Sequence, residues 1–308
     1  MNKFVILGCG YLGTNFANYI VNNSDCRVFV LGIENEYNNY LDTKVTFISK
    51  MIEQISKDDI ELFKDAVVID AVGNINATND SKNSNTIFLD NSISKVNLIQ
   101  MLNNLQIRNY IFLSSGGTVY NDSDIPHKED ESVDPKSIYA LEKIIIEDYL
   151  RIFGLENEEF SYLILRLSNP YGGVTSKNKK QGIIDVTINK LLNNEKVELF
   201  GRITNIRDYV YVDDVSRIIY VLSTMGIRND IINIGTGIGN SIKEIFTQIE
   251  ELFNKTIDYV EINNTIKMTN IDTNILDISK LKRIIGNFEM IDLKKGIEII
   301  KRNNDIQM

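Results

Sequence analysis

The chain has 308 residues, and 43% of them are hydrophobic, so it can bury a large core as one elaborated domain or as two smaller ones. A formal net charge of −9 without a long basic run argues against nucleic acid or an anionic membrane surface as a partner. No run approaches the roughly 18 apolar residues that span a membrane, and the only two cysteines, Cys9 and Cys26, suit an unbridged cytoplasmic protein.

The first segment of the chain predicts a dinucleotide site. Residues 3–7 form a short apolar strand, residues 8–13 form a G-x-G-x-x-G turn, and residues 14–20 continue with helical character towards a second apolar strand at 27–31. Such glycines allow a tight turn and a close approach of the backbone to a pyrophosphate at the helix N-terminus. The residues expected to contact the cofactor here are Gly8, Gly10, Tyr11, Leu12 and Gly13.

Apolar runs recur along the first half of the chain. Further strand-like runs occur at 45–48, 66–72, 109–114 and 161–167. Most of the gaps hold helical patterns, so the alternation predicts an α/β fold in which helices cover both faces of a doubly wound parallel (Rossmann) sheet. Residues 85–105 and the segment after Tyr139 form two long amphipathic helices, whose apolar sides pack in the core or pair across a homodimer.

Tyr139 and Lys143 lie one helical turn apart and therefore point the same way. A phenol has an unperturbed pKa of about 10, so it carries protons at neutral pH only beside positive charge. A lysine ammonium and an oxidised nicotinamide would supply that charge. Upstream, an apolar strand ends in Ser115-Gly-Gly-Thr118, whose hydroxyl groups are suited to hold a substrate oxygen against the phenol.

The pattern changes after residue 168, where shorter elements alternate with polar loops. We therefore expect a dinucleotide-binding domain over 1–168 and mainly a substrate-binding lobe over 169–308, with some segments returning to the first domain. His127, the only histidine, lies in an acid-rich loop that contains a proline, and it is expected to face solvent without a chemical role. No Cys/His cluster indicates a metal site.

The motifs occur in an order that is highly specific as a set. They are the glycine turn, Asp65-Ala-Val-Val-Ile-Asp-Ala-Val-Gly73, Asn91-x2-Ser94-Lys95, Ser114-Ser115-Gly-Gly-Thr118-Val-Tyr120, Tyr139-x3-Lys143, Arg166-x2-Asn169-Pro-Tyr-Gly172, Arg207-Asp208-Tyr-Val-Tyr-Val-Asp213-Asp214-Val and Asn233-Ile-Gly235-Thr-Gly237. Over nearly its whole length, the chain resembles the extended short-chain dehydrogenases, in particular the nucleotide-sugar epimerase, dehydratase and reductase group.

This resemblance implies roles for residues in the first half of the chain. Tyr139 would be the acid/base, while Lys143 would hold the nicotinamide ribose and lower the pKa of the tyrosine. Asn91 stands where the family has the asparagine of N-x-x-G-T, so it is counted among the cofactor-binding residues.

The resemblance also implies a substrate site in the second half. Asn169 would meet the sugar diphosphate, Phe200 would stack on the nucleotide base, and Arg207 would neutralise phosphate. The alternatives are that Phe200 is an edge-strand core residue and that Arg207 forms a plain surface ion pair. Lys267 stands where an arginine commonly contacts the diphosphate, which weakens that contact.

The chain departs from the family pattern at three places. The glycine turn is one residue shorter than usual, and the second strand ends at Gly32 without the acid that binds both ribose hydroxyls. Both NAD(H) and NADP(H) are candidate cofactors, although Glu34 and the lack of an adjacent Arg or Lys favour NAD(H). Gly116 stands where many relatives carry the catalytic hydroxyl, so Ser115 or Thr118 must supply it.

The function expected from the resemblance is hydride transfer at C4 of a nucleoside-diphosphate hexose. The first candidate is reduction of a 4-keto-6-deoxy sugar nucleotide, such as dTDP-4-dehydro-6-deoxyglucose, for surface polysaccharide biosynthesis, because the missing strand-end acid and the shortened turn indicate a loose hold on the dinucleotide. The alternatives are a UDP-hexose 4-epimerase with bound NAD and a non-catalytic dinucleotide sensor. A dehydratase ranks last, since Gly117 and Thr118 stand where it carries an Asp-Glu pair.

Overall fold

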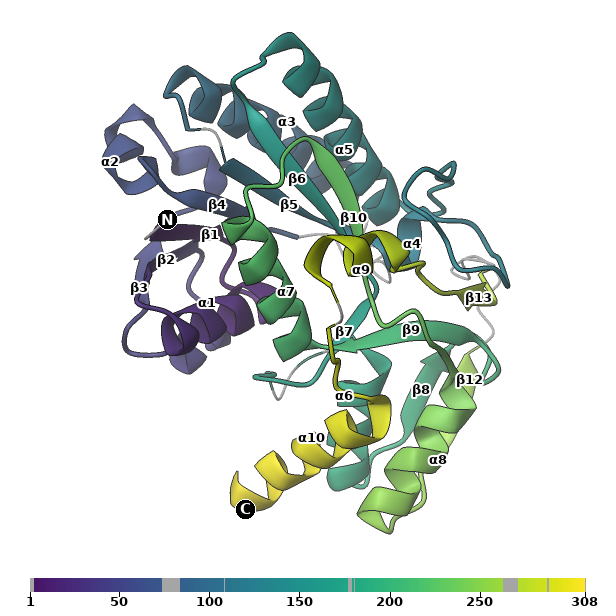
Figure 1. Cartoon of the computed structure of the whole chain (residues 1–308). Coiled ribbons are helices and arrows are strands. Elements are labelled where there is room, and N and C mark those ends of the chain that lie inside the picture. Colours follow the sequence, from purple (N-terminus) through teal and green to yellow (C-terminus); the bar gives the residue numbers. More distant parts are fainter. Residues whose placement is uncertain are drawn as a thin grey trace.

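A seven-stranded parallel sheet forms the larger part of the molecule (Figure 1). The computed structural model describes residues 3–73, 84–107, 109–176, 179, 181–262, 271–286 and 288–307. The strand order is β10-β6-β5-β4-β1-β2-β3, and every neighbouring pair is parallel. The strands are β1 (Lys3–Leu7), β2 (Arg27–Gly32), β3 (Thr46–Ser49), β4 (Val67–Asp70), β5 (Asn109–Ser115), β6 (Ser161–Leu167) and β10 (Asp230–Ile234). This order confirms the predicted doubly wound fold.

Helices cover both faces of this sheet. On one face lie α1 (Tyr11–Asn23) and α7 (Val212–Thr224), and on the other lie α3 (Ser84–Asn104) and α5 (Ile138–Glu156) (Figure 1). The two long helices expected from the sequence are therefore α3 and α5. No helix in the described part of the chain is both long and apolar enough to cross a membrane.

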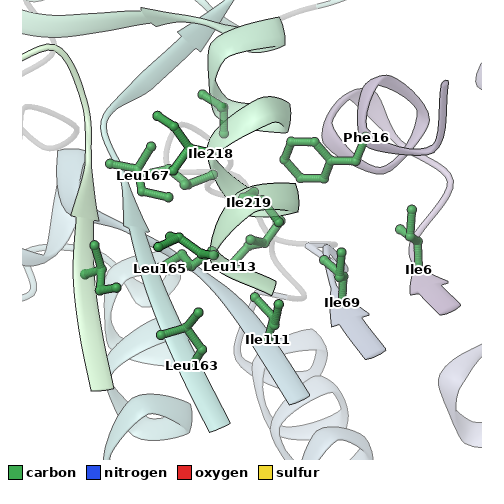
Figure 2. Close-up of a cluster of buried hydrophobic side chains, with 14 of the residues drawn as sticks. Ile6, Phe16, Ile69, Ile111, Leu113, Leu163, Leu165, Leu167, Ile218 and Ile219 are labelled. Atoms are coloured by element: carbon green, nitrogen blue, oxygen red, sulfur yellow. The ribbon is translucent and has the colours of Figure 1, made fainter. Parts of the chain in front are cut away.

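The strands are apolar at successive positions because both of their faces are buried. Successive side chains point to opposite faces of a sheet. In β1, Ile6 belongs to the core that contains Phe16 of α1 and Ile219 of α7 (Figure 2). Its neighbour Leu7 belongs to the opposite core, with Leu102 of α3. Continuous apolar runs, rather than alternating ones, are the expected pattern for such a sheet.

The remaining elements form a smaller lobe around a third core, which contains Tyr171, Ile188, Tyr211 and Phe246. A four-stranded sheet and a two-stranded sheet belong to this lobe. Its elements are β7 (Asn169–Tyr171), α6 (Ile183–Leu192), β8 (Val197–Phe200), β9 (Ile206–Tyr211), β11 (Gly239–Ser241), α8 (Ile242–Phe253), β12 (Tyr259–Ile262), β13 (Thr273–Asn274) and α10 (Leu293–Gln307). Three elements that follow residue 168 lie with the large sheet instead: α7, β10 and α9 (Ser279–Ile285), which packs on β10.

Short elements complete the fold. Two short α-helices are α2 (Ile60–Phe63) and α4 (Gly116–Val119), and 3₁₀ turns occur at Glu36–Tyr40, Ile52–Gln54 and Lys57–Asp59. Helix α4 follows β5 directly, so the hydroxyl-rich strand end turns at once into a helix at the carboxyl edge of the sheet.

The prediction that His127 faces solvent is wrong, because its side chain is only 3% exposed. Its ring stacks on Tyr120 with centroids 4.7 Å apart, Nδ1 lies 2.8 Å from the Glu131 carboxylate, and Nε2 lies 2.9 Å from the Asn121 carbonyl. Its backbone also bridges to Leu276. The contact with Leu276 joins segments far apart in the chain, so the composition of the loop gave no indication of it.

Candidate dinucleotide and catalytic site

The glycine turn meets the requirements of a pyrophosphate cradle. Gly8 adopts a φ of +100°, which favours glycine, and a Cβ at Gly13 would lie 1.9 Å from the Gly8 carbonyl oxygen, so neither position tolerates a side chain. Gly10 differs, because nothing lies within 4 Å of the place its Cβ would take. As the N-cap of α1, Gly10 has no side chain to cap the first N–H groups of the helix, and they remain suited to phosphate oxygens.

The cradle lies where the strand order changes direction. β1 has β4 on one side and β2 on the other, and Gly8 packs against the backbone of Ala71, which follows β4. Ligands of open α/β sheets bind at the carboxyl ends of the strands at such a point. These residues therefore fit a dinucleotide.

The end of β2 explains the missing acid. A Cβ at Gly32 would lie 2.8 Å from the backbone nitrogen of Cys9, so the strand end packs directly on the glycine turn. The Asn35 side chain also binds the turn here, by donating a 2.8 Å hydrogen bond to the Cys9 carbonyl. Glu34 lies nearby and is exposed. No carboxylate can stand at position 32 unless the turn moves.

Tyr11 contributes its main chain to the helix N-terminus, but its side chain turns to the other half of the molecule. Its hydroxyl donates to the Gly172 carbonyl at 3.0 Å, and the Lys179 ammonium lies 3.4 Å from the centre of its ring. Lys179 in turn pairs with Asp185 at 2.6 Å. Leu12 packs against the core beneath the turn. The phenol of Tyr11 thus ties the cradle to the loop that follows β7.

Three of the predicted catalytic residues come together at the start of α5. The Ser137 hydroxyl caps this helix by accepting from the Ala140 N–H at 3.1 Å, and this places Tyr139 in the first turn. The Ser115 side chain interacts with the Tyr139 phenol and lowers its pKa. Lys143 is buried one turn further on, where its Nζ donates to the Leu113 carbonyl at 3.0 Å and lies 5.6 Å from the centre of the Tyr139 ring.

The protonation of Tyr139 follows from this setting. Burial raises the pKa of Tyr139 above its ordinary value, while the Ser115 hydrogen bond lowers it, the Glu142 charge raises it and the Lys95 charge lowers it. Because the net shift is upward, the phenol holds its proton at neutral pH in this state. It becomes a proton acceptor only when further positive charge arrives.

The structure distinguishes between the two hydroxyls proposed for catalysis. The Ser115 side chain interacts with the Tyr139 phenol, whereas the Thr118 hydroxyl is buried without a hydrogen-bond partner among the described residues. A Cβ at Gly116 would lie 2.7 Å from the Leu276 side chain, so that position faces the core. Of the two hydroxyls, that of Ser115 is therefore the one near Tyr139, and its catalytic role remains a prediction.

Three of the predicted substrate residues, Asn169, Phe200 and Arg207, belong to strands of the smaller lobe. Asn169 donates to the Asp208 carbonyl at 2.8 Å, and its amide oxygen lies 3.4 Å from the Cβ position of Gly117 in α4. Phe200 is 58% exposed at the end of β8, so its alternative role as a core residue is wrong. Its ring presents an open aromatic face.

Arg207 is held by main-chain carbonyls. Its guanidinium donates to Ile271 at 2.6 Å, to Asp272 at 3.0 Å and to Ile206 at 2.8 Å, and burial lowers its pKa. These contacts differ from the surface ion pair considered as its alternative. Contact with phosphate remains a prediction for Arg207, and Lys267 lies outside the described residues.

Asn91 and Lys95 lie one turn apart on α3 and face the catalytic helix and β4. Asn91 donates to the Glu142 carboxylate at 3.3 Å, and its contact with a cofactor remains a prediction. Lys95 is 1% exposed and pairs with Asp70 at 2.5 Å. Sequence reasoning missed this pair, although the chain carried a signal for it. The signal consists of Lys95, in the segment that corresponds to the family's N-x-x-G-T, and Asp70, at the end of the apolar strand before it.

Comparison with known proteins agrees with this geometry. The model of the "NAD dependent epimerase/dehydratase family" matches residues 4–235. The chain is 30% identical over 307 residues to a "Putative UDP-glucose 4-epimerase" of Methanocaldococcus jannaschii, covering 96% of the chain and 97% of the relative. It is 34% identical over 217 residues to a dTDP-4-dehydro-6-deoxyglucose reductase of Escherichia coli, covering 70% and 68%.

Solved structures share the fold. A UDP-glucose 4-epimerase of Thermotoga maritima, solved with UDP-glucose, aligns over 99% of both chains with a TM-score of 0.86 and 24% identity. A UDP-glucose 4-epimerase of Thermus thermophilus, solved with NAD, aligns over 97% of this chain and 99% of that one, with a TM-score of 0.82 and 20% identity.

Proposed function

The chain belongs to the NAD-dependent epimerase/dehydratase family, whose enzymes modify nucleotide sugars, and from this membership we propose that it reduces the C4 ketone of a 4-keto-6-deoxy sugar nucleotide. The E. coli relative with 34% identity is named as such a reductase, of dTDP-4-dehydro-6-deoxyglucose. We assign dinucleotide binding to residues 1–168 and recognition of the sugar nucleotide mainly to the lobe over 169–308.

The main observation in favour of a reductase is the structure at the end of β2. Because Gly32 packs on Cys9, no carboxylate stands at the strand end to accept hydrogen bonds from the ribose hydroxyls. Each missing bond weakens dinucleotide binding by about 1 kcal/mol. A reductase must release its spent cofactor at every turnover, whereas an epimerase keeps its cofactor in place, so a weak hold suits the reductase.

Tyr139 has a part in the proposed reaction. Its phenol is protonated at neutral pH, as an unperturbed tyrosine would be, and burial raises its pKa further. A protonated phenol can donate a proton to the ketone oxygen during reduction. We assign the Ser115 side chain, which interacts with the phenol, to hold that oxygen. A bound reduced nicotinamide would supply the hydride.

Lys143 and the glycine turn would hold the dinucleotide. An ammonium group has three N–H donors, and Lys143 directs one of them to the Leu113 carbonyl. We assign the nicotinamide ribose to its remaining donors and the pyrophosphate to the N-terminus of α1 beside Gly10. NAD(H) is preferred over NADP(H), because Glu34 would repel a 2′-phosphate and residues 33–40 contain no Arg or Lys.

A panel of nucleotide sugars tests this function. The protein is incubated with dTDP-, UDP- and GDP-linked 4-keto-6-deoxyhexoses and with NADH or NADPH, while the absorbance of the reduced cofactor is followed and the products are identified. We expect one of these substrates to consume reduced cofactor stoichiometrically. Failure of all of them to do so would exclude the reductase.

A 4-epimerase is the second candidate. It is favoured by the M. jannaschii relative, which matches nearly the whole length of the chain and carries that name. A dehydratase has less support, because Gly117 and Thr118 supply neither of its two carboxylates. Membership in an enzyme family, together with the Tyr139–Lys143 pair, leaves a purely sensing role without support.

Phe200 gives a direct test of substrate binding. Replacing it by alanine should raise the KM for the sugar nucleotide about tenfold or more, equivalent to about 1.4 kcal/mol, because the exposed ring would lose its stacking on the base. Titration of NADH should give an unchanged affinity. Phe200→Tyr keeps the aromatic face and serves as the matched control, with a KM near that of the native protein.

Arg207 needs a separate control because its guanidinium also tethers the backbone near Asp272. Arg202 pairs with the carboxylate of Asp272 at the surface, so Arg202→Ala removes a neighbouring positive charge without touching the tether. A phosphate-binding Arg207 predicts a raised KM in Arg207→Ala alone. Equal weakening of NADH and sugar-nucleotide binding in Phe200→Ala or Arg207→Ala would indicate a structural role instead.

We propose that the enzyme is a homodimer formed through α3 and α5. These helices pack side by side (Figure 1). Each of them carries exposed apolar residues one or two turns apart. The residues are Leu89, Ile93, Ile145 and Ile152. An apolar surface built from two adjacent helices can meet the same surface of a second copy about a twofold axis, as isologous dimers require.

Charge placed on this surface should separate the dimer. We expect Ile93→Lys combined with Ile152→Lys to elute as a monomer with the fold retained, as measured by light scattering after size exclusion. Ile125 is an exposed apolar residue in the loop after Tyr120, so Ile125→Lys is the control and should remain dimeric. A native protein that is already monomeric would refute the dimer.

A further inference from the structure

Lys95 and Asp70 form an ion pair inside the protein, beside the candidate catalytic residues. Lys95 lies on α3 and is 1% exposed, while Asp70 ends β4 and is fully buried. The Lys95 ammonium lies 2.5 Å from Asp70 Oδ2 and 3.3 Å from the Val72 carbonyl. Asp70 also accepts from the Tyr110 hydroxyl at 2.7 Å and from the Val72 N–H at 2.9 Å. Every contact is thus made at the strand end that borders the dinucleotide cradle.

Stability alone gives no reason for this pair. Removing two charges from water costs free energy that their attraction often only offsets, and apolar residues of similar volume frequently stabilise a core as well or better. The strand end could have been apolar like the rest of β4, which is entirely buried. The placement of the charges therefore points to a role beyond packing.

The pair belongs to a buried group of four charges that includes the catalytic lysine. Two are cations, Lys95 and Lys143, and two are anions, Asp70 and Glu142, and all four are buried. The ammonium groups of Lys95 and Lys143 lie 5.4 Å and 4.9 Å from the centre of the same Phe112 ring. The group balances in charge, so loss of one member leaves a net charge next to Tyr139.

Asp70 interacts with both lysines. Burial alone would raise the pKa of Asp70, but the charges of Lys95 and Lys143 outweigh it and hold that pKa below its usual value. Lys95 makes the direct contact, while Lys143 donates to the Leu113 carbonyl. If Lys95 were absent, the uncompensated carboxylate would attract the Lys143 ammonium away from Leu113.

We propose that Lys95 is a positioning residue of the reaction centre, which occupies Asp70 so that Lys143 stays directed at Leu113 and the cofactor, and which adds a second positive charge beside Tyr139. This inference rests on the proposed reductase function. Lys95 is buried and paired with Asp70, so it acts through Lys143 and through the field at the phenol.

The charged and titratable groups around Tyr139 determine in which direction its titration moves when Lys95 or Asp70 is replaced. Its own helix contributes Lys143 and Glu142, and β5 contributes the hydroxyl of Ser115. Lys95 comes from α3 and Asp70 from β4, while α4 contributes only the neutral Thr118. On the side of β6, Arg166 and Glu147 neutralise each other in a 2.6 Å ion pair.

Removal of either charge should therefore move the titration of Tyr139, in opposite directions. Burial lowers the pKa of Lys95 against the attraction of Asp70, so the Lys95 charge acts on Tyr139 as long as the lysine is protonated. Without that charge, the phenolate is less favoured and Tyr139 titrates at higher pH; without the Asp70 charge, it titrates at lower pH. Reduction needs the protonated phenol, so turnover is lost as pH rises through this titration. The alkaline limb of the turnover profile should move up in Lys95→Met and down in Asp70→Asn.

The experiment compares Lys95→Met, Asp70→Asn and the double variant. Tyr139 is titrated by the near-ultraviolet absorbance of tyrosinate, as the difference between each protein and the same protein with Tyr139→Phe, and turnover is measured against pH. We expect opposite shifts in the single variants and a titration near the native one in the double variant. Turnover should fall about tenfold in Lys95→Met and recover largely in the double variant, because the neutral amide at position 70 no longer attracts Lys143.

The outcomes separate this proposal from others. Lower thermal stability in each variant with an unmoved Tyr139 titration would show that the pair is structural and overturn the proposal. If Lys95→Met does not fold, the Asp70→Asn variant is sufficient for the test. A Tyr139 titration moved to lower pH supports the proposal, and an unmoved titration overturns it. The titration uses no sugar nucleotide, so a native protein that reduces none of the panel refutes the proposed function while leaving the test of Lys95 intact.

Discussion

Replacing Tyr139 by phenylalanine is expected to lower turnover by about a hundredfold or more while the protein folds and binds dinucleotide normally. The substitution removes only the hydroxyl, which interacts with Ser115 and is the group proposed to exchange a proton with the substrate oxygen. The ring, and with it the packing beside Lys143, remains. Turnover, thermal unfolding and NADH binding are measured on the same preparation.

A matched control comes from the same helix. Tyr149 stacks on Phe153 further along α5, so Tyr149→Phe also deletes one hydroxyl but should retain native turnover. Near-native turnover in Tyr139→Phe would contradict the acid/base assignment. Loss of NADH binding together with turnover would show instead that the hydroxyl organises the cofactor site.

Gly13→Ala is expected to weaken dinucleotide binding by about a hundredfold or more, equivalent to about 2.7 kcal/mol, and to lower the temperature of unfolding. The added Cβ would lie 1.9 Å from the Gly8 carbonyl oxygen, a main-chain atom that cannot move aside alone. Helix α1 would have to shift, and its N-terminal N–H groups would shift with it. Titration with NADH and thermal unfolding measure the two effects.

Gly10→Ala separates binding from folding in the same turn. Gly10 has an ordinary φ of −115°, and no atom lies within 4 Å of its Cβ position, so Gly10→Ala should lower the free energy of unfolding by no more than about 1 kcal/mol, the effect of alanine at an N-cap. A pyrophosphate at this place would meet the new methyl group, and NADH affinity should still fall. Unchanged affinity in both Gly10→Ala and Gly13→Ala would place the dinucleotide elsewhere.

The strands and the Tyr139–Lys143 pair could be predicted from the sequence, because each depends on a local pattern of residues. Apolar runs predicted the parallel strands, because strands buried on both faces must be apolar at successive positions. The spacing of Tyr139 and Lys143 placed them on one side of a helix, where the structure has them. The departure at Gly116 predicted that Ser115 or Thr118 supplies the hydroxyl, and only the structure brings the Ser115 side chain to the Tyr139 phenol. The catalytic role of Ser115 remains a prediction.

Contacts between distant segments could not be read in this way. His127 was expected in solvent because its loop is polar, but its backbone bridges to Leu276 and its ring is stacked inside. The Lys95–Asp70 pair joins a helix to a strand that lies earlier in the chain. The Arg207 guanidinium is held by carbonyls of residues 271 and 272. In each case the partner is fixed by tertiary packing, which local spacing does not encode.

The dinucleotide content of the purified protein distinguishes a reductase from a 4-epimerase. Because Gly32 leaves no room for a ribose-binding carboxylate, one or two hydrogen bonds of about 1 kcal/mol each are missing, and the cofactor should exchange with solution. Denatured protein should then release little NAD, and conversion of a 4-keto-6-deoxyhexose nucleotide should require added NADH or NADPH. Near-stoichiometric NAD, together with interconversion of two C4 epimers without added cofactor, would contradict the reductase and establish the 4-epimerase.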